Sequence, residues 1–208
     1  MKNVIEIKHP LVEHKLTHLR NKDTKSKEFK EYLEEITSLM AYEVLKDVKI
    51  KQVPVTTPVA KTKGGQIQQK VTIYPILRAG LGMSEGFTKM LPSIKVGHIG
   101  MYRDPATLKP VEYLFKYPEG AKPGINIIVD PMVATGGSAE LAIDKLVKTG
   151  MKNIQFVALV TSKKAITMLS KKYPNVKFFV ASIDPILNKK GYIEPGLGDA
   201  GDRIFGTK

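Results

Sequence analysis

Short runs of consecutive apolar residues recur along the chain and alternate with stretches that have a helical pattern. The runs lie at residues 71–77, 94–101, 125–129, 156–160 and 176–181. A strand that is apolar on both faces belongs in the interior of a parallel sheet, because helices cover such a sheet on both sides. The pattern therefore predicts an α/β fold with a mainly parallel central sheet flanked by helices.

Helical patterns fill most of the remaining chain. Residues 11–20 and 26–46 predict two helices, and in the second one apolar side chains recur at steps of three and four residues. Further helices are expected after Arg78, from the glycine turn near residue 137 to Lys148, and over residues 162–172. No internal repeat or interdomain linker interrupts this order, so we predict a single domain over residues 1–208.

Three segments do not follow the alternation of strand and helix. Residues 48–60, with prolines at positions 54 and 58, predict an edge strand, and Lys63-Gly64-Gly65 predicts a turn. Residues 111–118 predict a strand that pairs with the run at 94–101 as a hairpin arm. Residues 184–208 are rich in Gly, Pro and Asp and have little periodicity.

The charge of the chain is strongly positive. It has 33 Lys and Arg against 20 Asp and Glu, a net charge of +13. Such an excess can indicate a polyanionic partner, namely nucleic acid, membrane headgroups or a phosphorylated substrate. The lysines are scattered along the chain and form no long block, which favours a lysine-rich surface without specific nucleic-acid binding.

The sequence also restricts the location of the protein. No apolar run is long enough to cross a membrane, and the N-terminus lacks the apolar stretch of a signal peptide. The chain has no cysteine, so it forms no disulfide and no thiolate metal site. These features favour a soluble, cytoplasmic protein without a membrane partner.

The most informative loop follows the central apolar run. In open α/β sheets, ligands bind beyond the carboxyl ends of the strands. The run at 125–129 ends there in Asp130, followed by Pro131, Met132, Val133, Ala134, Thr135, Gly136, Gly137 and Ser138. Its two glycines let the main chain approach a ligand, and free N–H groups at the start of a helix attract an anion. The alternative is an ordinary glycine-rich turn in which Ser138 caps the helix.

Two common phosphate motifs do not fit. The turn does not end in the Gly-Lys-Ser/Thr of a nucleoside-triphosphate loop, and residues 80–86 do not match the dinucleotide fingerprint. Instead, Asp130 precedes the glycine turn at a distance where its carboxylate can accept hydrogen bonds from ribose hydroxyls. This arrangement resembles the phosphoribosyl diphosphate (PRPP) motif of type I phosphoribosyltransferases.

Further segments narrow the resemblance to one family. The segments YPILRAGLGM, DPMVATGGS and GYIEPGLGDAGDRIFGTK together resemble the uracil phosphoribosyltransferases, and HPLVEHKLTHLR and MYRDPATLKPV are also similar to that family. The resemblance covers almost the whole chain, and its C-terminal segment is the most specific. It implies a type I phosphoribosyltransferase-like fold with a protruding hairpin arm and an irregular base-binding segment over residues 191–208.

The resemblance implies an activity and assigns residues to it. The expected reaction transfers the phosphoribosyl group of PRPP to N1 of uracil, giving UMP and diphosphate. PRPP is assigned to Arg78, Arg103, Asp130, Pro131, Met132, Val133, Ala134, Thr135, Gly136, Gly137, Ser138 and Asp199. Uracil is assigned to the main chain of Ile193, Gly198, Asp199 and Ala200, and catalytic roles go to Arg78, Asp130 and Asp199.

Several of these assignments have alternatives. Arg78 and Arg103 would hold the diphosphate, Arg103 from an arm that closes over the substrate, but an isolated arginine such as Arg78 can also form a surface ion pair. Gly80 and Gly82 are expected to leave the next helix N-terminus open to the same anion. Tyr192 either stacks on the base or packs in the core. The acceptor of the uracil N1 proton is not identifiable from the sequence.

Metal ions and departures from the family complete the expectations. Pro131 occupies the place of a second acid in many type I relatives, so Mg²⁺ is expected to arrive on the PRPP diphosphate instead of on a protein ligand. His14 and His18 have zinc-ligand spacing without a third ligand, which favours a solvated helix face. Residues 161–164 and Glu194 depart from the family pattern near the predicted site.

The resemblance also implies a homodimer or homotetramer and a possible GTP effector. Two other functions are alternatives to uracil phosphoribosyl transfer. One is an RNA-binding regulator with a phosphoribosyltransferase-like fold. The other is the same enzyme class acting on a purine or on orotate.

Overall fold

The central sheet is mainly parallel, as the sequence predicts. The computed structural model describes residues 1–103 and 110–207. Seven strands cross the sheet in the order β1 (Val4–Glu6), β11 (Lys177–Asp184), β10 (Ile154–Ser162), β8 (Ile125–Val129), β4 (Val71–Leu77), β6 (His98–Arg103) and β7 (Pro110–Lys116). Two short strands join them, β5 (Lys95–Val96) beside β4 and β9 (Met132–Val133) beside β10. Every pair is parallel except β6 with β7.

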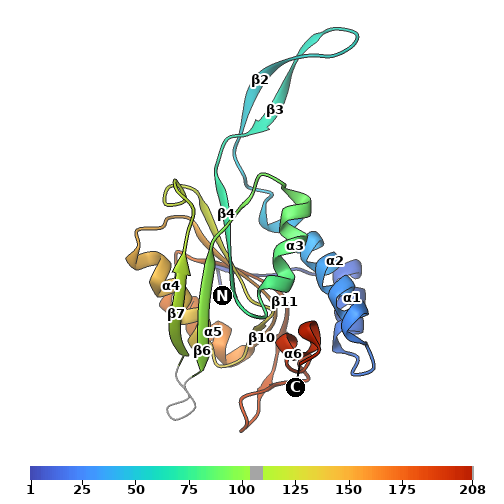
Figure 1. Cartoon of the computed structure of the whole chain (residues 1–208), viewed down its shortest axis with the longest axis vertical. Helices are drawn as coiled ribbons and strands as arrows, with labels where there is room; N and C mark the ends of the chain where they lie inside the picture. Colours follow the sequence, from blue (N-terminus) through green and yellow to red (C-terminus); the bar gives the residue numbers. More distant parts are fainter. Residues whose placement is uncertain (104–109, 208) are drawn as a thin grey trace.

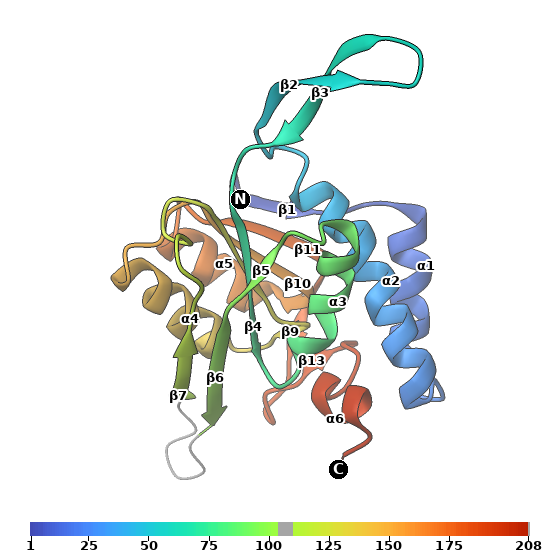
Figure 2. The ribbon, with the colours of Figure 1, turned by 45° about the horizontal axis from the view of Figure 1, so that its top comes forward.

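Helices cover both faces of this sheet. On one face lie α1 (Pro10–Arg20), α2 (Ser26–Val44) and α3 (Leu81–Met90), and on the other lie α4 (Gly137–Lys148) and α5 (Lys163–Lys172) (Figures 1 and 2). Successive side chains of a strand point to opposite faces. In β8, Ile127 and Val129 therefore join the core beneath α1, α2 and α3, whereas Ile128 joins the core beneath α4 and α5.

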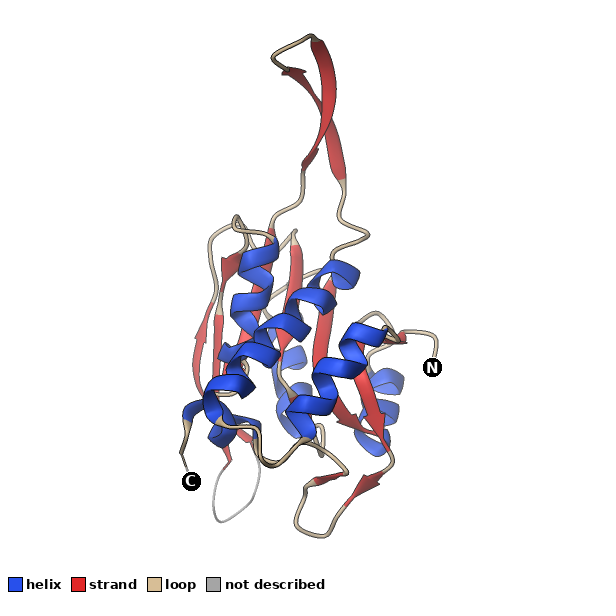
Figure 3. Ribbon diagram, turned by 90° about the vertical axis from the view of Figure 1, so that its right-hand side faces the viewer, coloured by secondary structure: helices blue, strands red, loops and turns tan. Residues whose placement is uncertain are grey.

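A two-stranded hairpin protrudes from the body of the molecule. It is formed by β2 (Ile50–Thr56) and β3 (Lys61–Ile67), which pair with each other and not with the central sheet (Figure 3). The edge strand expected at 48–60 is thus β2, but its partner is only β3. The turn expected at Lys63-Gly64-Gly65 is wrong, because these residues lie inside β3. The chain turns instead where the Thr57 hydroxyl accepts the N–H groups of Val59 and Ala60, at 3.2 and 3.0 Å.

Other strands differ from the prediction in smaller ways. The expected hairpin of residues 94–118 is confirmed as the antiparallel pair β6–β7, which forms one edge of the central sheet. The other edge is β1, which the sequence pattern did not indicate. The C-terminal stretch contains an antiparallel pair of two-residue strands, β12 (Ile186–Leu187) and β13 (Ile193–Glu194), and a short helix, α6 (Ala200–Phe205).

Of the helices in the described ranges, none has the length and the apolar character that crossing a membrane would require.

Candidate active site

The carboxyl ends of the central strands meet at one edge of the sheet. Strands β4, β8, β10 and β11 run parallel, so Arg78, Asp130, Ser162 and Asp184 all lie at or directly after strand ends on that edge. Helix α6 and the chain before it lie along the same edge (Figure 2). The predicted site residues from distant parts of the sequence are therefore gathered in one region.

Residues 130–138, here called the phosphate loop, are seated on strand β10. The Pro131 carbonyl accepts the N–H groups of Leu159 and Val160 at 3.2 and 3.1 Å. At the other end of the loop, Gly136 has a φ of +90° and precedes helix α4 without a side-chain cap. Glycine adopts this left-handed conformation at no steric cost. The alternative role of Ser138 as the helix cap is wrong, because Ser138 lies inside α4.

The start of α4 offers N–H groups that have no partner within the helix, although that of Gly137 donates to the Thr135 hydroxyl at 3.5 Å. The first intrahelical bond runs from the Glu140 N–H to the Gly136 carbonyl at 2.8 Å. The N–H groups in the turn before it have no partner within the helix, and the helix dipole adds partial positive charge there. Together with the Thr135 and Ser138 hydroxyls, this turn can bind a phosphate.

Two residues that depart from the family pattern support this loop. The Ser162 hydroxyl donates to the Ala134 carbonyl at 2.6 Å and accepts the Ala165 N–H at 3.0 Å, so it caps α5 and holds the loop with the same oxygen. The Thr161 hydroxyl donates to the Val133 carbonyl at 3.3 Å. These departures are therefore built into the support of the phosphate loop.

Asp130 lies partly buried in a small cavity formed by this loop. Burial raises the pKa of its carboxyl to about 7, and the negative charge of Asp199 raises it further, against a hydrogen bond from the Met132 N–H. A carboxyl with this pKa changes ionisation near neutral pH, where a bound ribose diol would favour the charged, hydrogen-bond-accepting form.

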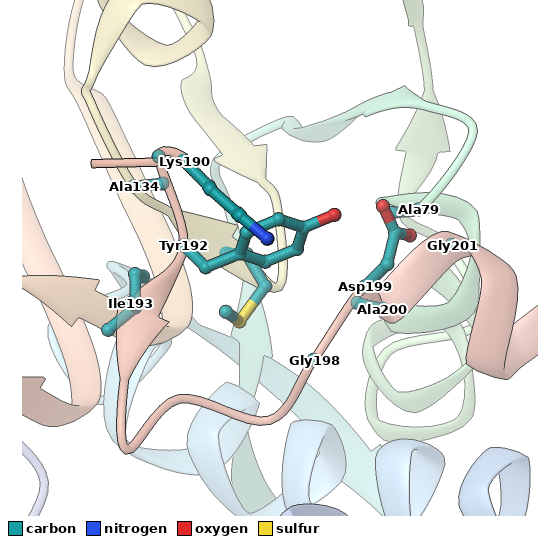
Figure 4. Close-up of a pocket in the computed structure, with 11 residues that line it drawn as sticks. Ala79, Ala134, Lys190, Tyr192, Ile193, Gly198, Asp199, Ala200 and Gly201 are labelled. Carbon is teal, nitrogen blue, oxygen red and sulfur yellow. The ribbon is translucent and has the colours of Figure 1, made fainter. Parts of the chain in front are cut away.

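A larger cavity adjoins the phosphate loop and is here called the base cavity. Its volume is about 440 Å³. It is lined by Ala79, Met132, Ala134, Lys190, Gly191, Tyr192, Ile193, Gly198, Asp199, Ala200 and Gly201 (Figure 4). Met132 and Ala134 also line the small cavity of the phosphate loop. The two cavities therefore adjoin each other.

The four residues assigned to uracil all line the base cavity. The Ile193 side chain is buried in the core, so its main chain is what it offers to a ligand. Gly198 has a φ of +79°. Asp199 accepts the Asp202 N–H at 3.0 Å and so caps α6, which begins at Ala200. Of these four residues, only Asp199 has a polar side chain, so the others can offer a ligand only their peptide groups as polar partners.

Tyr192 extends into the base cavity and is half exposed. The alternative of a packed core tyrosine is therefore wrong. Figure 4 shows its hydroxyl and the Asp199 carboxylate pointing toward one another across the cavity. Its ring is available to stack on a planar ligand.

Arg78 lies at the same edge but makes an exposed ion pair. Its guanidinium is 3.7 Å from the Asp202 carboxylate and lies over the Phe205 ring at 5.7 Å, both in α6. The side chain is 59% exposed, so the ion pair is weak and a diphosphate can replace it. The main chain of Arg103 ends β6, but its side chain and residues 104–109 lie outside the described residues.

Gly80 and Gly82 serve packing, and their expected role at the anion site stays a prediction. A Cβ on Gly80 would lie 2.5 Å from the Val129 carbonyl oxygen, and one on Gly82 would lie 2.5 Å from Leu33. Both glycines therefore let α3 approach the sheet and α2.

Sequence reasoning missed Lys190, Ala79 and Gly201 as residues that line the base cavity. Lys190 follows Lys189, and a pair of lysines in a chain with lysines scattered along its whole length does not stand out as a site. Figure 4 shows that its side chain extends into the cavity beside Tyr192. The only local signal for a role in the site is its position directly before Gly191, where the base-binding segment begins.

Within the described part of the chain, no three His, Cys, Asp or Glu side chains are grouped so that they could hold a metal ion. His14 and His18 are in edge-to-face contact at 4.7 Å, and His18 stacks on Tyr32 at 4.4 Å. Asp130 and Asp199 are the carboxylates nearest the predicted substrates, and Mg²⁺ commonly binds one or two carboxylates together with substrate phosphates. The site therefore fits a magnesium ion that PRPP carries.

Comparison with known proteins identifies the relatives of this chain. The family model described as uracil phosphoribosyltransferase matches residues 6–207. The uracil phosphoribosyltransferase of Finegoldia magna is 53% identical over 209 residues and covers 100% of both chains. That of Anoxybacillus flavithermus is 50% identical, again with 100% of both chains covered.

Solved structures agree with this result. The AQ2163 protein from Aquifex aeolicus has a TM-score of 0.91 and 35% identity, with 97% of each chain covered. An adenine phosphoribosyltransferase from Trypanosoma brucei has a TM-score of 0.57 and 13% identity, covering 92% of this chain and 88% of its own. At that identity, the second likeness shows the fold alone, which is that of type I phosphoribosyltransferases.

Proposed function

The chain belongs to the uracil phosphoribosyltransferase family, and from this premise we propose how its loops divide the two substrates. As a member of the family, it transfers the phosphoribosyl group of PRPP to uracil and forms UMP and diphosphate. One observation carries the division: the base cavity and the phosphate loop share Met132 and Ala134. This adjacency suits a reaction in which a base bound in one site attacks a sugar whose phosphate is bound in the neighbouring site.

In this proposal, PRPP lies along the phosphate loop. The N–H groups at the start of α4, with Thr135 and Ser138, bind the 5′-phosphate, and Asp130 accepts hydrogen bonds from the ribose hydroxyls. Arg78 leaves Asp202 and forks across two oxygens of the diphosphate. Arg103 is the second diphosphate ligand that the family resemblance implies.

Uracil lies in the base cavity in this proposal. Its N3–H and its two carbonyl oxygens require both acceptors and donors. The peptide groups of Ile193, Gly198 and Ala200 can supply both, and Tyr192 stacks on the base. Main-chain recognition suits a loop with glycines, because no side chain keeps the peptide groups away from the base.

The chemical step is a displacement at C1′. The N1 electron pair forms the new bond to C1′, and the N1 proton passes to water or to the departing diphosphate. The C1′–O bond breaks, and its electron pair leaves with the diphosphate. The ribose develops oxocarbenium character, as in glycoside cleavage. Asp130 and Asp199 place negative charge near the sugar, while the arginines stabilise the departing diphosphate.

Magnesium would enter with PRPP. The metal would neutralise phosphate charge when bound, and waters instead of protein side chains would complete its shell. Removal of Mg²⁺ by a chelator is expected to abolish turnover of PRPP, and added Mg²⁺ is expected to restore it.

Assembly, regulation and location are predictions that the family resemblance and the composition support. The hairpin β2–β3 exposes the apolar side chains of Ile50, Val55, Val59 and Ile67, and a partner subunit could cover them in a homodimer or homotetramer. A GTP effector is also proposed, and initial rates measured with and without the nucleotide test it. A cytoplasmic location, which the lack of cysteine favours, is tested by fractionation.

The choice of base tests the proposed function directly. Diphosphate release from PRPP and Mg²⁺ is measured with uracil, hypoxanthine, adenine or orotate as acceptor. Uracil is expected to be preferred, and an equal or better rate with a purine or orotate would contradict the proposal.

RNA binding tests the regulatory rival. If the excess charge is only a lysine-rich surface, RNA binds weakly and loses affinity steeply as salt rises. Tight and sequence-selective binding at physiological salt would favour the rival.

A further inference from the structure

Two arginines link the base-binding segment to the corner between helices α1 and α2. We call residues 191–203 the base loop and residues 19–24 the helix corner. Arg20 reaches from the corner to the loop, and Arg203 reaches from the loop to the corner. Neither is among the residues that line the base cavity.

Arg20 forms a two-point ion pair with Asp184 at the end of β11. Its two terminal nitrogens are each 2.7 Å from one oxygen of the carboxylate. The Asp184 side chain is only 3% exposed. Burial on its own raises the pKa of Asp184, but hydrogen bonds from Arg20, Ser182 and the Gly196 N–H outweigh it and leave the pKa below its ordinary value. The carboxylate is thus charged and fully engaged.

This ion pair holds both polar groups of Gly196. The Gly196 carbonyl accepts from Arg20 Nη1 at 2.7 Å, and the Gly196 N–H donates to Asp184 Oδ2 at 2.8 Å. The positive Arg20 therefore binds the carbonyl of Gly196, and the negative Asp184 binds its N–H. Such charge-assisted bonds are stronger than neutral ones, so the position of Gly196 is tightly defined.

Gly196 in turn rests on Ile193, whose main chain lines the base cavity. Gly196 has a φ of +57°, and a Cβ there would lie 2.2 Å from the Ile193 carbonyl oxygen. No space therefore separates Gly196 from the Ile193 carbonyl on that side, and the two peptide groups are packed against each other. The ion pair behind the loop thus sets the position of a group that faces the base.

Arg203 fixes the next peptide along the loop. It donates to the carbonyls of Leu197 at 2.8 Å and of Asn21 at 2.6 Å, and also to the Leu19 carbonyl. Its guanidinium lies over the Phe29 ring at 4.3 Å. Arg203 therefore ties Leu197, directly before Gly198 and Asp199, to the helix corner.

We propose that Arg20, Asp184 and Arg203 are positioning residues, which hold the peptide groups of the base loop in the geometry that binds uracil. The inference rests on the proposed function, since it takes uracil as the ligand of the base cavity. The three residues act through Gly196 and Leu197, without contact with the substrate. The phosphate loop is seated on β10 by different contacts, those of the Pro131 carbonyl with Leu159 and Val160.

The test compares three conservative variants with one control. The variants are Arg20→Lys, Asp184→Asn and Arg203→Lys. The two lysine variants keep the positive charge but lose the fork of donors, and the asparagine variant keeps the size of the side chain but loses its charge. The control is Lys15→Ala, which removes another cation of α1, paired with Glu35 at 2.6 Å. Steady-state rates give KM for uracil and for PRPP separately, and thermal melts show that each variant is folded.

We expect each variant to raise KM for uracil about tenfold or more, the usual effect of losing a charged hydrogen bond. KM for PRPP is expected to stay within about twofold, and the control to match the wild type. If folded variants keep the wild-type KM for uracil, or raise both KM values in parallel, the inference is overturned. A wild-type protein that does not use uracil would instead contradict the proposed function, so the two failures are distinguishable.

Discussion

Asp130 illustrates at the scale of one residue how binding and stability compete. Its pKa is raised to about 7 by burial, against about 3.8 for an ordinary aspartate. The folded protein therefore binds a proton at Asp130 more tightly than the unfolded chain does. The stability from this protonated carboxyl is fully present below about pH 4 and is lost as the pH rises through 7.

The variant Asp130→Asn should therefore be more stable than the wild type at pH 8, although it binds PRPP more weakly. The gain is expected to be about 1–2 kcal/mol, or a Tm about 2–8 °C higher, and to shrink toward pH 4. Thermal melts over this pH range measure it. The exposed Asp47, which pairs with Lys177, provides the control Asp47→Asn. Equal gains for both variants at all pH values would contradict the assignment of the raised pKa.

Arg78→Ala tests the diphosphate contact. Removal of a charged donor that stabilises the leaving group should raise the free energy of the transition state by about 2–4 kcal/mol. The value of kcat/KM for PRPP should fall accordingly. Its pairing with Asp202 is exposed, so folding should be little affected. Lys61→Ala, on the protruding hairpin, is the control. The diphosphate assignment is wrong if the two variants behave alike.

At the scale of elements, the site consists of loops that the ends of strands and helices hold in place. The phosphate loop is fixed by β10 and by the start of α5, through Pro131 and Ser162. The base loop is fixed by the helix corner and by β11, through Arg20 and Asp184. The two substrates can therefore be disturbed separately, although their loops adjoin.

Gly198→Val tests the base loop alone. Gly198 has a φ of +79°, and a Cβ would meet only Arg203 at 3.6 Å, so the chain should fold at the cost of local strain. The added methyls would enter the base cavity, and uracil binding should be lost while PRPP binding is kept. Calorimetry with each ligand separates the two.

The matched control for this substitution is Gly150→Val. Gly150 has a φ of +84° with nothing within 4 Å of a Cβ, so the backbone strain is similar but lies at the end of α4. This variant should bind both ligands normally. If Gly198→Val binds uracil and loses PRPP, the assignment of the two loops is reversed.

Ser162→Ala tests the link between α5 and the phosphate loop. Loss of the helix cap should cost about 1 kcal/mol, and loss of the bond to the Ala134 carbonyl should raise KM for PRPP. Thermal melts and steady-state rates measure the two effects. Thr167→Ala removes an exposed hydroxyl of the same helix and should change neither. An unchanged KM for PRPP in Ser162→Ala would show that the loop does not need this support.

At the scale of the whole molecule, the protruding hairpin is the part that the body does not stabilise. A lone two-stranded hairpin is marginally stable in water, and this one exposes four large apolar side chains. At its base, the Gln68 N–H donates to the Lys49 carbonyl at 2.9 Å, so the two ends of the hairpin are adjacent. Contact with another subunit is the proposed reason for its length.

Replacement of residues 50–67 by Asn-Gly should therefore leave the body folded and reduce the mass of the assembly. A two-residue turn of this type can join the adjacent ends. Light scattering gives the mass, and circular dichroism gives the fold. An oligomer of unchanged size would show that other surfaces hold the subunits together.

The sequence alone determined the parallel sheet, the position of the phosphate loop and the position of the base loop. Runs such as Ile125–Val129 predict buried parallel strands because both faces are apolar, and such sheets bind ligands at their carboxyl ends. The glycines of both loops carry a local conformational signal. Features that depend on residues close together in the sequence, such as a buried strand or a glycine loop, could therefore be predicted from the sequence.

Only the tertiary structure decided which distant residues meet. Arg20 and Asp184 are 164 positions apart, and β1 joins the sheet edge only because β11 lies beside it. In the sequence, Lys190 does not differ from the many other lysines, and only the folded chain places it at the base cavity. Local periodicity reports which face of an element is apolar, but packing between elements decides what that face, or a charged side chain, will contact.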